Sequence, residues 1–214
     1  PVAAGEIIGR ANGFDFSVNN DDVVLKGFVI PEHYQEPWKI HTVDMFEHFV
    51  EPIKSQLLAR NVGQKEPRSG KIDYDIDGKL IGNWFLEGNG GYQNGPGNYW
   101  VKHLSFVYNT LDPSFVVFSI GDYDGTSKDF GVKGNAPDPA TVTVGSGLVK
   151  YELVYFEYMK DDGTLWDRIS FAKLSRAVGL DTVEGVALVQ MIGDRKIKFE
   201  TFPGKVASDV AGFT

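Results

Sequence analysis

Seven strand-like segments follow one another between residues 71 and 205, and this run limits the fold more than any other feature. The segments are rich in β-branched and aromatic residues and are separated by turn signals. Two of the breaks, Asp124-Gly125 and Gly193-Asp194, are typical of β-hairpin turns. The run predicts a mainly β fold, an antiparallel β-barrel or β-sandwich over about residues 70–205. The segments are GKLIGNWFLEG, NYWVKHLSFVYN, SFVVFSIGDYDG, ATVTV, GLVKYELVYFEYM, VEGVALVQMIG and RKIKFETF.

Two other regions precede this run. In residues 1–30, two strand patterns flank Asn12-Gly13, which predicts an N-terminal β-hairpin. Residues 31–69 contain four prolines and the clearest helical pattern of the chain, which predicts a Pro-rich helical connector. The expected organisation is therefore a hairpin at 1–30, a connector at 31–69 and an antiparallel β-barrel or sandwich domain at 70–214.

Two or three short helices are expected within this β architecture. In the connector, Asp44 is placed to cap a short helical turn, and Pro52 is expected in the first turn of a second helix. A third helix is expected over residues 166–179, WDRISFAKLSRAVG, with Asp167 as its cap and Gly179 as its end.

Charge and cysteine content limit the partners. The net charge is −8 and the basic residues are scattered, so a nucleic acid backbone would be repelled. No apolar stretch is long enough to span a membrane as a helix. The chain has no Cys, which excludes disulfides and thiolate metal sites.

Because the sequence starts at Pro1 without an initiator Met, we expect a fragment or processed part of a longer protein.

The opening stretch PVAAGEIIGRANGFDFSV resembles the C-terminal hairpin of lysostaphin-type (LytM-like) zinc peptidases, in which a V-x-x-G-x-x-I-G strand leads through a Gly-rich turn to H-L-H-F-E-V. Gly13 and Asp15 stand where that family has its two histidines, so its zinc ligands do not carry over. The resemblance covers fewer than a tenth of the residues. It implies a non-catalytic remnant of a hammerhead fold. The matching positions are Val2, Gly5, Ile8, Gly9, Phe16 and Val18.

Two acidic loops are candidates for a calcium site. The first, DYDIDGKLIGNW, has carboxylates at the first three ligand positions of a calcium loop, but Trp84 stands where the bidentate Glu is required. The alternation of apolar and acidic residues favours instead a β-hairpin with a solvated acidic face. In the second loop, GDYDGTSKDFG, turn formation is the alternative to calcium binding. The candidate ligands are Asp73, Asp75, Asp77, Asp122, Asp124 and Asp129.

A Gly-rich loop over residues 89–98 carries the candidate ligand-binding residues, Tyr92 with the flanking Tyr99 and Trp100. Aromatic rings beside Asn and Asp suit sugars, which have an apolar face and a hydroxylated edge. The same rings would otherwise pack the loop onto its sheet. No G-x-S-x-G nucleophile motif and no phosphate-binding loop is present.

These features predict a non-enzymatic extracellular or cell-envelope β module for binding or assembly. Its expected partner is a glycan or a protein, including a second copy of the chain. The alternatives are a carboxylate- or metal-dependent hydrolase that acts on a polysaccharide, and a barrel that carries a small apolar ligand.

Overall fold

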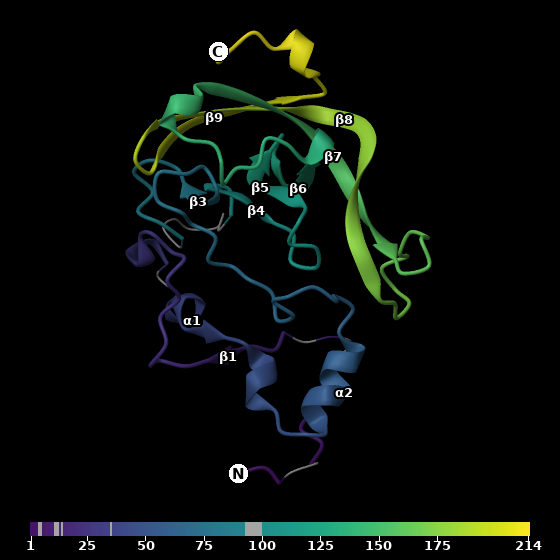
Figure 1. Ribbon diagram of the computed structural model, residues 1–214. Coiled ribbons are helices and arrows are strands. Elements are labelled where there is room, and N and C mark those ends of the chain that lie inside the picture. Colours follow the sequence, from purple (N-terminus) through teal and green to yellow (C-terminus); the bar gives the residue numbers. More distant parts are fainter. Residues whose placement is uncertain (4–5, 11–12, 14, 35, 93–99) are drawn as a thin grey trace.

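The computed structural model describes the 214-residue chain except for residues 4–5, 11–12, 14, 35 and 93–99 and the side chain of Pro37. A seven-stranded antiparallel sheet dominates it, with the strands in chain order, and curls into a half-barrel (Figure 1). The mainly β prediction is therefore confirmed. The strands are β3 (Gly82–Phe85), β4 (His103–Tyr108), β5 (Val116–Tyr123), β6 (Thr126–Val132), β7 (Leu148–Lys160), β8 (Leu174–Gly193) and β9 (Lys196–Pro203).

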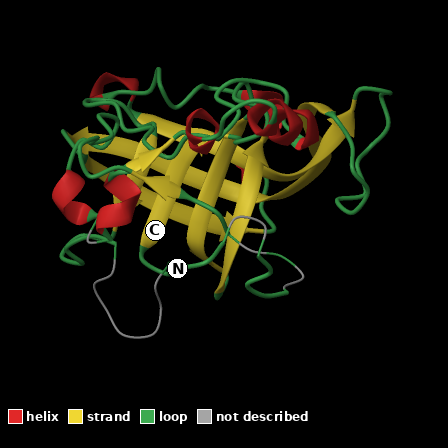
Figure 2. Cartoon of the chain, turned by 90° about the horizontal axis from the view of Figure 1, so that it is seen from below, coloured by secondary structure: helices red, strands yellow, loops and turns green. Residues whose placement is uncertain are grey.

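Smaller elements surround this sheet. Seen from the N-terminal side, they lie around one continuous curved sheet (Figure 2). They are the two-stranded sheet of β1 (Val18–Asn19) and β2 (Thr42–Val43), the helices α1 (Pro37–Ile40) and α2 (Ile53–Arg60), and 3₁₀ turns at Pro31–His33, Met45–His48, Lys133–Asn135, Val144–Ser146 and Ala207–Asp209. No helix in the described part of the chain is long and apolar enough to cross a membrane.

The predicted turns between strands are largely confirmed, but two segments differ. Asp124-Gly125 joins β5 to β6, and the turn after Gly193 joins β8 to β9. The polar segment TSKDFGV forms β6, because its Phe130 and Val132 enter the core while Asp129, which lies between Lys128 and Phe130, faces outward. The segment ATVTV at 140–144 forms turns instead of the expected strand.

The helix expected over residues 166–179 is wrong. Residues from Leu174 onward belong to β8, which pairs with β7 through most of its length. The apolar spacing of this segment fits a helix locally, but pairing with β7 satisfies its backbone groups along the sheet. In the connector, Asp44 caps its turn as predicted, since its carboxylate accepts the Phe46 N–H at 2.8 Å. Pro52 is the N-cap of α2 and not a residue of its first turn.

The expected N-terminal hairpin is not formed by the described residues. Strand β1 pairs antiparallel with β2 of the connector, and none of the described residues before Val18 lies in a strand. Ile7 and Ile8 are 79% and 85% exposed. An isolated two-stranded hairpin is only marginally stable in water, and these side chains have no apolar surface here to bury against.

The core fills the concave side of the half-barrel. Phe106, Phe118 and Tyr151 are almost completely buried there, and their rings meet edge to face at 4.5 and 4.6 Å. The opposite, outer face of β8 is covered by the C-terminal tail, where Val210 packs on Val186 and Leu188. The interior of the sheet is therefore packed with side chains, whereas the outer face is covered by different parts of the chain at different strands.

The hairpin of β7 and β8 extends beyond the rest of the sheet as a long arm, which Asp112 ties to the body (Figure 1). Asp112 lies between β4 and β5 and is 2% exposed. Its carboxylate accepts the Ala177 N–H of β8 at 2.8 Å and also pairs with Lys65 and Ser114. Burial opposes its ionisation, but these hydrogen bonds outweigh burial and hold the pKa of Asp112 below its ordinary value.

Replacing Asp112 with Ala is expected to lower the free energy of unfolding by about 3 kcal/mol, because it leaves buried N–H and hydroxyl donors without an acceptor. Urea denaturation measures this loss. The matched control is Asp181→Ala, an exposed aspartate of β8, which should change stability by less than about 0.5 kcal/mol. Equal stability of the two variants would show that Asp112 does not hold the arm.

The same residue predicts a pH dependence. An acid whose pKa is depressed by folding stabilises the native state above its unfolded pKa of about 3.9, and this contribution is lost as pH falls through the folded pKa. Wild-type protein should therefore lose more stability than Asp112→Asn between about pH 5 and pH 3. Parallel stability curves for the two proteins would contradict the assignment.

Candidate functional site

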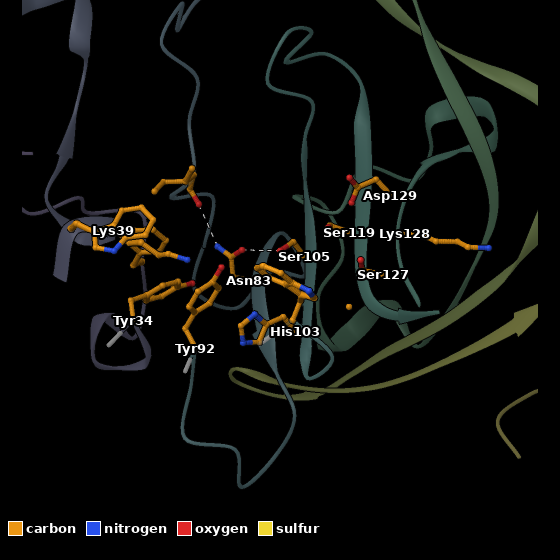
Figure 3. Close-up of a pocket in the computed structure, with 15 residues that line it drawn as sticks. Tyr34, Lys39, Asn83, Tyr92, His103, Ser105, Ser119, Ser127, Lys128 and Asp129 are labelled. Atoms are coloured by element: carbon orange, nitrogen blue, oxygen red, sulfur yellow. Dashed lines mark hydrogen bonds between the residues drawn. The ribbon is translucent and has the colours of Figure 1, made fainter. Parts of the chain in front are cut away.

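A cavity of about 500 Å³ lies against the outer face of β3 to β6. The sheet forms its floor, and residues of the N-terminal region together with the segment before β4 form its wall (Figure 3). Chain segments far apart in sequence therefore enclose one site. We call it the outer cavity.

The floor carries a row of polar side chains at equivalent positions of four adjacent strands. Asn83 pairs with Ser105, Ser105 with Ser119, and Ser119 with Asp129. Their chain neighbours point into the core, so strand alternation places all four on the outer face. With neighbouring strands about 4.8 Å apart, this polar row is about 14 Å long. The Ser105 hydroxyl donates to Asn83 Oδ1 at 2.8 Å (Figure 3).

Gly121 brings the segment before β4 directly onto the sheet. A Cβ atom at Gly121 would lie 1.6 Å from the carbonyl oxygen of Trp100 and 2.8 Å from that of His103. Only glycine permits this approach of two backbones. It places Trp100 beside the polar row.

The wall of the cavity is aromatic. It contains Phe28, Tyr34, Trp38, Tyr92 and Trp100. Tyr34 packs against Phe28 with ring centroids 4.1 Å apart, while Trp38 and Trp100 are about half exposed, at 48% and 55%. The two tryptophans thus present ring surface at the cavity, while Phe28 and Tyr34 lie in its buried part.

One cation enters this aromatic wall. Lys39 Nζ lies 3.1 Å from the ring centroid of Tyr92 and pairs with the Glu36 carboxylate at 2.9 Å. Lys128 also borders the cavity, but its side chain points away from it (Figure 3). Lys39 therefore brings a positive charge to the wall, where the Tyr92 ring and the Glu36 carboxylate stabilise it.

His103 lies where the floor meets the wall. Its ring stacks on Tyr92 at 4.3 Å and meets Phe85 edge to face at 4.9 Å. Burial, aided by the charge of Lys39, lowers the pKa of His103 to about 4. The imidazole is thus neutral near pH 7, with one nitrogen a donor and the other an acceptor.

Tyr34 places an unused hydroxyl at the buried end of the cavity. The residue is 7% exposed, and its hydroxyl points toward the Asn83 side chain but makes no hydrogen bond of normal geometry with any of the described residues (Figure 3). Burial and the negative charge of Asp75 raise the pKa of Tyr34 far above its ordinary value, so the hydroxyl stays protonated. A buried hydroxyl without a partner is costly, and a ligand that supplies an acceptor would satisfy it.

Asp75 fastens this wall to the sheet. Its carboxylate accepts the N–H of Val29 at 3.2 Å and that of Asn83 at 2.7 Å, and it faces the Arg195 guanidinium at 3.3 Å. Desolvation raises the pKa of Asp75 despite these hydrogen bonds and the positive charge of Arg195. Asp73 assists by accepting the Gly27 N–H at 2.9 Å.

The solvated acidic hairpin expected over DYDIDG is therefore wrong, because residues 71–76 form no strand and the acidic side chains do not all face solvent. Tyr74 and Asp75 are buried, whereas Ile72 and Ile76 are 43% and 47% exposed. The physical reason is the N-terminal segment, which lies alongside and donates its backbone N–H groups to the carboxylates. The expected turn at Asp77-Gly78 is present, and Asp77 accepts the Gly78 N–H at 3.1 Å.

The other candidate metal residues are dispersed. Asp122 accepts the Gly125 N–H at 2.9 Å, and Asp124 occupies the turn between β5 and β6 with a φ of 53°. Asp129 instead lines the outer cavity. Within the described ranges, no three His, Asp or Glu side chains gather closely enough to hold a metal ion.

Of the three aromatic residues proposed from sequence as ligand contacts, Tyr92 and Trp100 both line the outer cavity, and Tyr99 lies outside the described residues. Sequence analysis missed Tyr34 and Trp38 in the connector and the polar row on the strands. The available signal was a single serine inside each of the otherwise largely apolar segments HLSFVY and VVFSIG. That pattern alone is also typical of a solvated sheet face.

Comparison with known proteins finds no family model, no curated protein and no solved structure that matches this chain. The site is therefore interpreted from its own geometry.

Proposed function

We propose that the chain is a non-enzymatic binding module whose outer cavity takes a saccharide. One observation carries the proposal: a row of hydrogen-bonding side chains, Asn83, Ser105, Ser119 and Asp129, faces an aromatic wall across a single cavity. A sugar ring has an apolar face and a hydroxylated edge. Each surface of the cavity is complementary to one of them.

The polar groups match hydroxyl ligands in kind and in charge. Serine hydroxyls and the neutral His103 both donate and accept, as sugar hydroxyls do. The Tyr34 hydroxyl adds a buried donor that has no acceptor among the described residues. Trp38 and Trp100 offer exposed ring surface on which a sugar face can stack.

The lining supports binding without cleavage. Glycosidases place two carboxyl groups on either side of the scissile bond. Among the described lining residues, Asp129 is the only carboxylate. This composition favours recognition over hydrolysis of a polysaccharide.

The proposed partner and cellular location of the module follow from the proposed binding of a saccharide. Glycans are exposed in the cell envelope and outside the cell, and the resemblance of residues 1–18 to LytM-like peptidases is consistent with that location. We therefore propose a secreted or cell-envelope protein with a glycan as its partner.

Binding of short oligosaccharides tests the proposal. Isothermal titration with cellotriose, chitotriose and mannotriose should show saturable binding of at least one of them. Trp100→Ala and Trp38→Ala should each weaken that binding about tenfold, which is the loss of about 1.4 kcal/mol of ring contact. Ser119→Ala, which removes one of the two serine hydroxyls of the polar row, should weaken it by a similar factor.

Phe171→Ala is the matched control, because Phe171 is a 64% exposed aromatic residue on the β7–β8 arm. It should leave sugar binding unchanged. If none of the trisaccharides binds, or if Phe171→Ala weakens binding as much as Trp100→Ala, the outer cavity is not a saccharide site.

The pH dependence of binding gives a second test. Because the pKa of His103 is lowered to about 4, the affinity should stay constant between about pH 5.5 and pH 8. Protonation below this range places a second cation beside Lys39 and should weaken binding. His103→Gln, which stays neutral, should lose less affinity at low pH. A midpoint near pH 6.5 in the wild type would contradict this role of His103.

A further inference from the structure

The two halves of the polar row in the outer cavity differ in how many of their hydrogen bonds are already made. At the β3 end, Ser105 donates to Asn83 at 2.8 Å, and the Asn83 amide donates to the Ile72 carbonyl at 3.3 Å. At the β6 end, the side chains of Ser119 and Asp129 make no hydrogen bond or ion pair with any described residue. The β6 end of the row is therefore the part that can bond to a ligand without breaking a contact.

Ser127 belongs to the same end of the cavity. It lies two residues before Asp129 on β6, so both side chains leave the same face of the sheet, and both line the cavity. Ser119 is the cross-strand partner of Asp129, which puts their Cβ atoms about 5 Å apart. The Ser127 hydroxyl also has no hydrogen bond within the described part of the chain. Figure 3 shows these three residues together at one side of the cavity, and we call them the acceptor cluster.

The chemistry of the acceptor cluster suits a primary ammonium group. Such a group has three N–H donors and no acceptor, and here one carboxylate and two hydroxyls border the same space. Hydrogen bonds between charged partners are shorter and stronger than those between neutral ones. A ligand that offers only hydroxyl groups would leave the charge of Asp129 without a counterion.

The positive charges that line the cavity do not neutralise Asp129. Lys39 lies on the opposite side of the cavity and pairs with Glu36 at 2.9 Å (Figure 3). Lys128 points away from the cavity, and its Nζ lies 5.2 Å from the ring centroid of Tyr123, which belongs to the core. Among the described lining residues, Asp129 is therefore the charged group that a cationic ligand can pair with.

We infer that the outer cavity prefers an amino sugar, with the protonated amine of one sugar unit at the acceptor cluster and a neighbouring unit against the aromatic wall. The inference rests on the function proposed above and adds to it the class of sugar and the direction in which the saccharide lies. Trp100 supports it, because Gly121 holds the Trp100 backbone two residues from Ser119, and an aromatic ring near a cation stabilises it.

Three trisaccharides with the same β-linked backbone test the inference, because they differ only in the substituent of the second ring carbon. Cellotriose carries a hydroxyl there, chitotriose an acetamide and the trimer of glucosamine an amine. Calorimetry with the full chain at about pH 5.5, where an amine carries its proton, should give about tenfold tighter binding of the glucosamine trimer than of the other two.

The outcomes separate this inference from the function on which it rests. If cellotriose or chitotriose binds as tightly as the glucosamine trimer, the preference for an amino sugar is overturned while the saccharide site stands. If none of the three binds, the inference is overturned, and the proposed function falls with it unless mannotriose binds.

Variants locate the amine. Asp129→Asn keeps the size of an exposed side chain but removes its charge, and it should reduce the preference for the glucosamine trimer over cellotriose from about tenfold to about equal affinity. Ser127→Ala, which removes one acceptor, should reduce the preference about threefold.

Asp124→Asn is the matched control. It removes one negative charge from the same hairpin, at an exposed position outside the cavity lining whose φ of 53° Asn tolerates, and it should keep the preference. A preference that survives Asp129→Asn, or that Asp124→Asn abolishes as completely, would overturn the assignment to the acceptor cluster.

Discussion

The Asp75 carboxylate is the contact on which the arrangement of the molecule depends. It joins three segments that are distant in sequence: the N-terminal region through Val29, the edge strand β3 through Asn83, and the β8–β9 turn through Arg195. Desolvating a carboxylate is costly, and here hydrogen bonds and a neighbouring guanidinium offset that cost. This contact, together with the hydrogen bond between Gly27 and Asp73, holds the aromatic wall of the outer cavity over its polar floor.

Because side chains alternate along each strand, one face of the sheet forms the core and the other forms the floor of the outer cavity. Phe106 and Phe118 enter the packed interior, while Ser105 and Ser119, each one residue before or after them, form the floor of the outer cavity. Stability and recognition thus come from the same short strands without competing for positions. A one-residue slip in register would exchange the two sets of side chains, so core packing also fixes the geometry of the binding face.

The sequence predicts the sheet well and its surroundings poorly. Apolar alternation and hairpin dipeptides identify most strands, because these signals act between chain neighbours. The same signals fail at β6, because Lys128 and Asp129 interrupt the apolar pattern by which a strand is recognised. They also fail at residues 174–179, where the spacing of apolar residues indicates a helix but the segment pairs with β7. The aromatic residues of the Gly-rich loop were identified as a candidate site from sequence. Their partners Tyr34 and Asn83 were not, because the region of Tyr34 is brought to Asn83 by the hydrogen bond between Val29 and Asp75, which are 46 positions apart in sequence.

The order of the strands has a consequence for how the molecule assembles. Every strand of the large sheet pairs with its neighbour in the chain, so the sheet can grow hairpin by hairpin with short loop closures. The outer cavity requires contacts between residues 27–39 and residues 73–129, which close much longer loops. A chain with a complete sheet can thus still lack its cavity, and ligand affinity is a stricter measure of correct folding than β-sheet content.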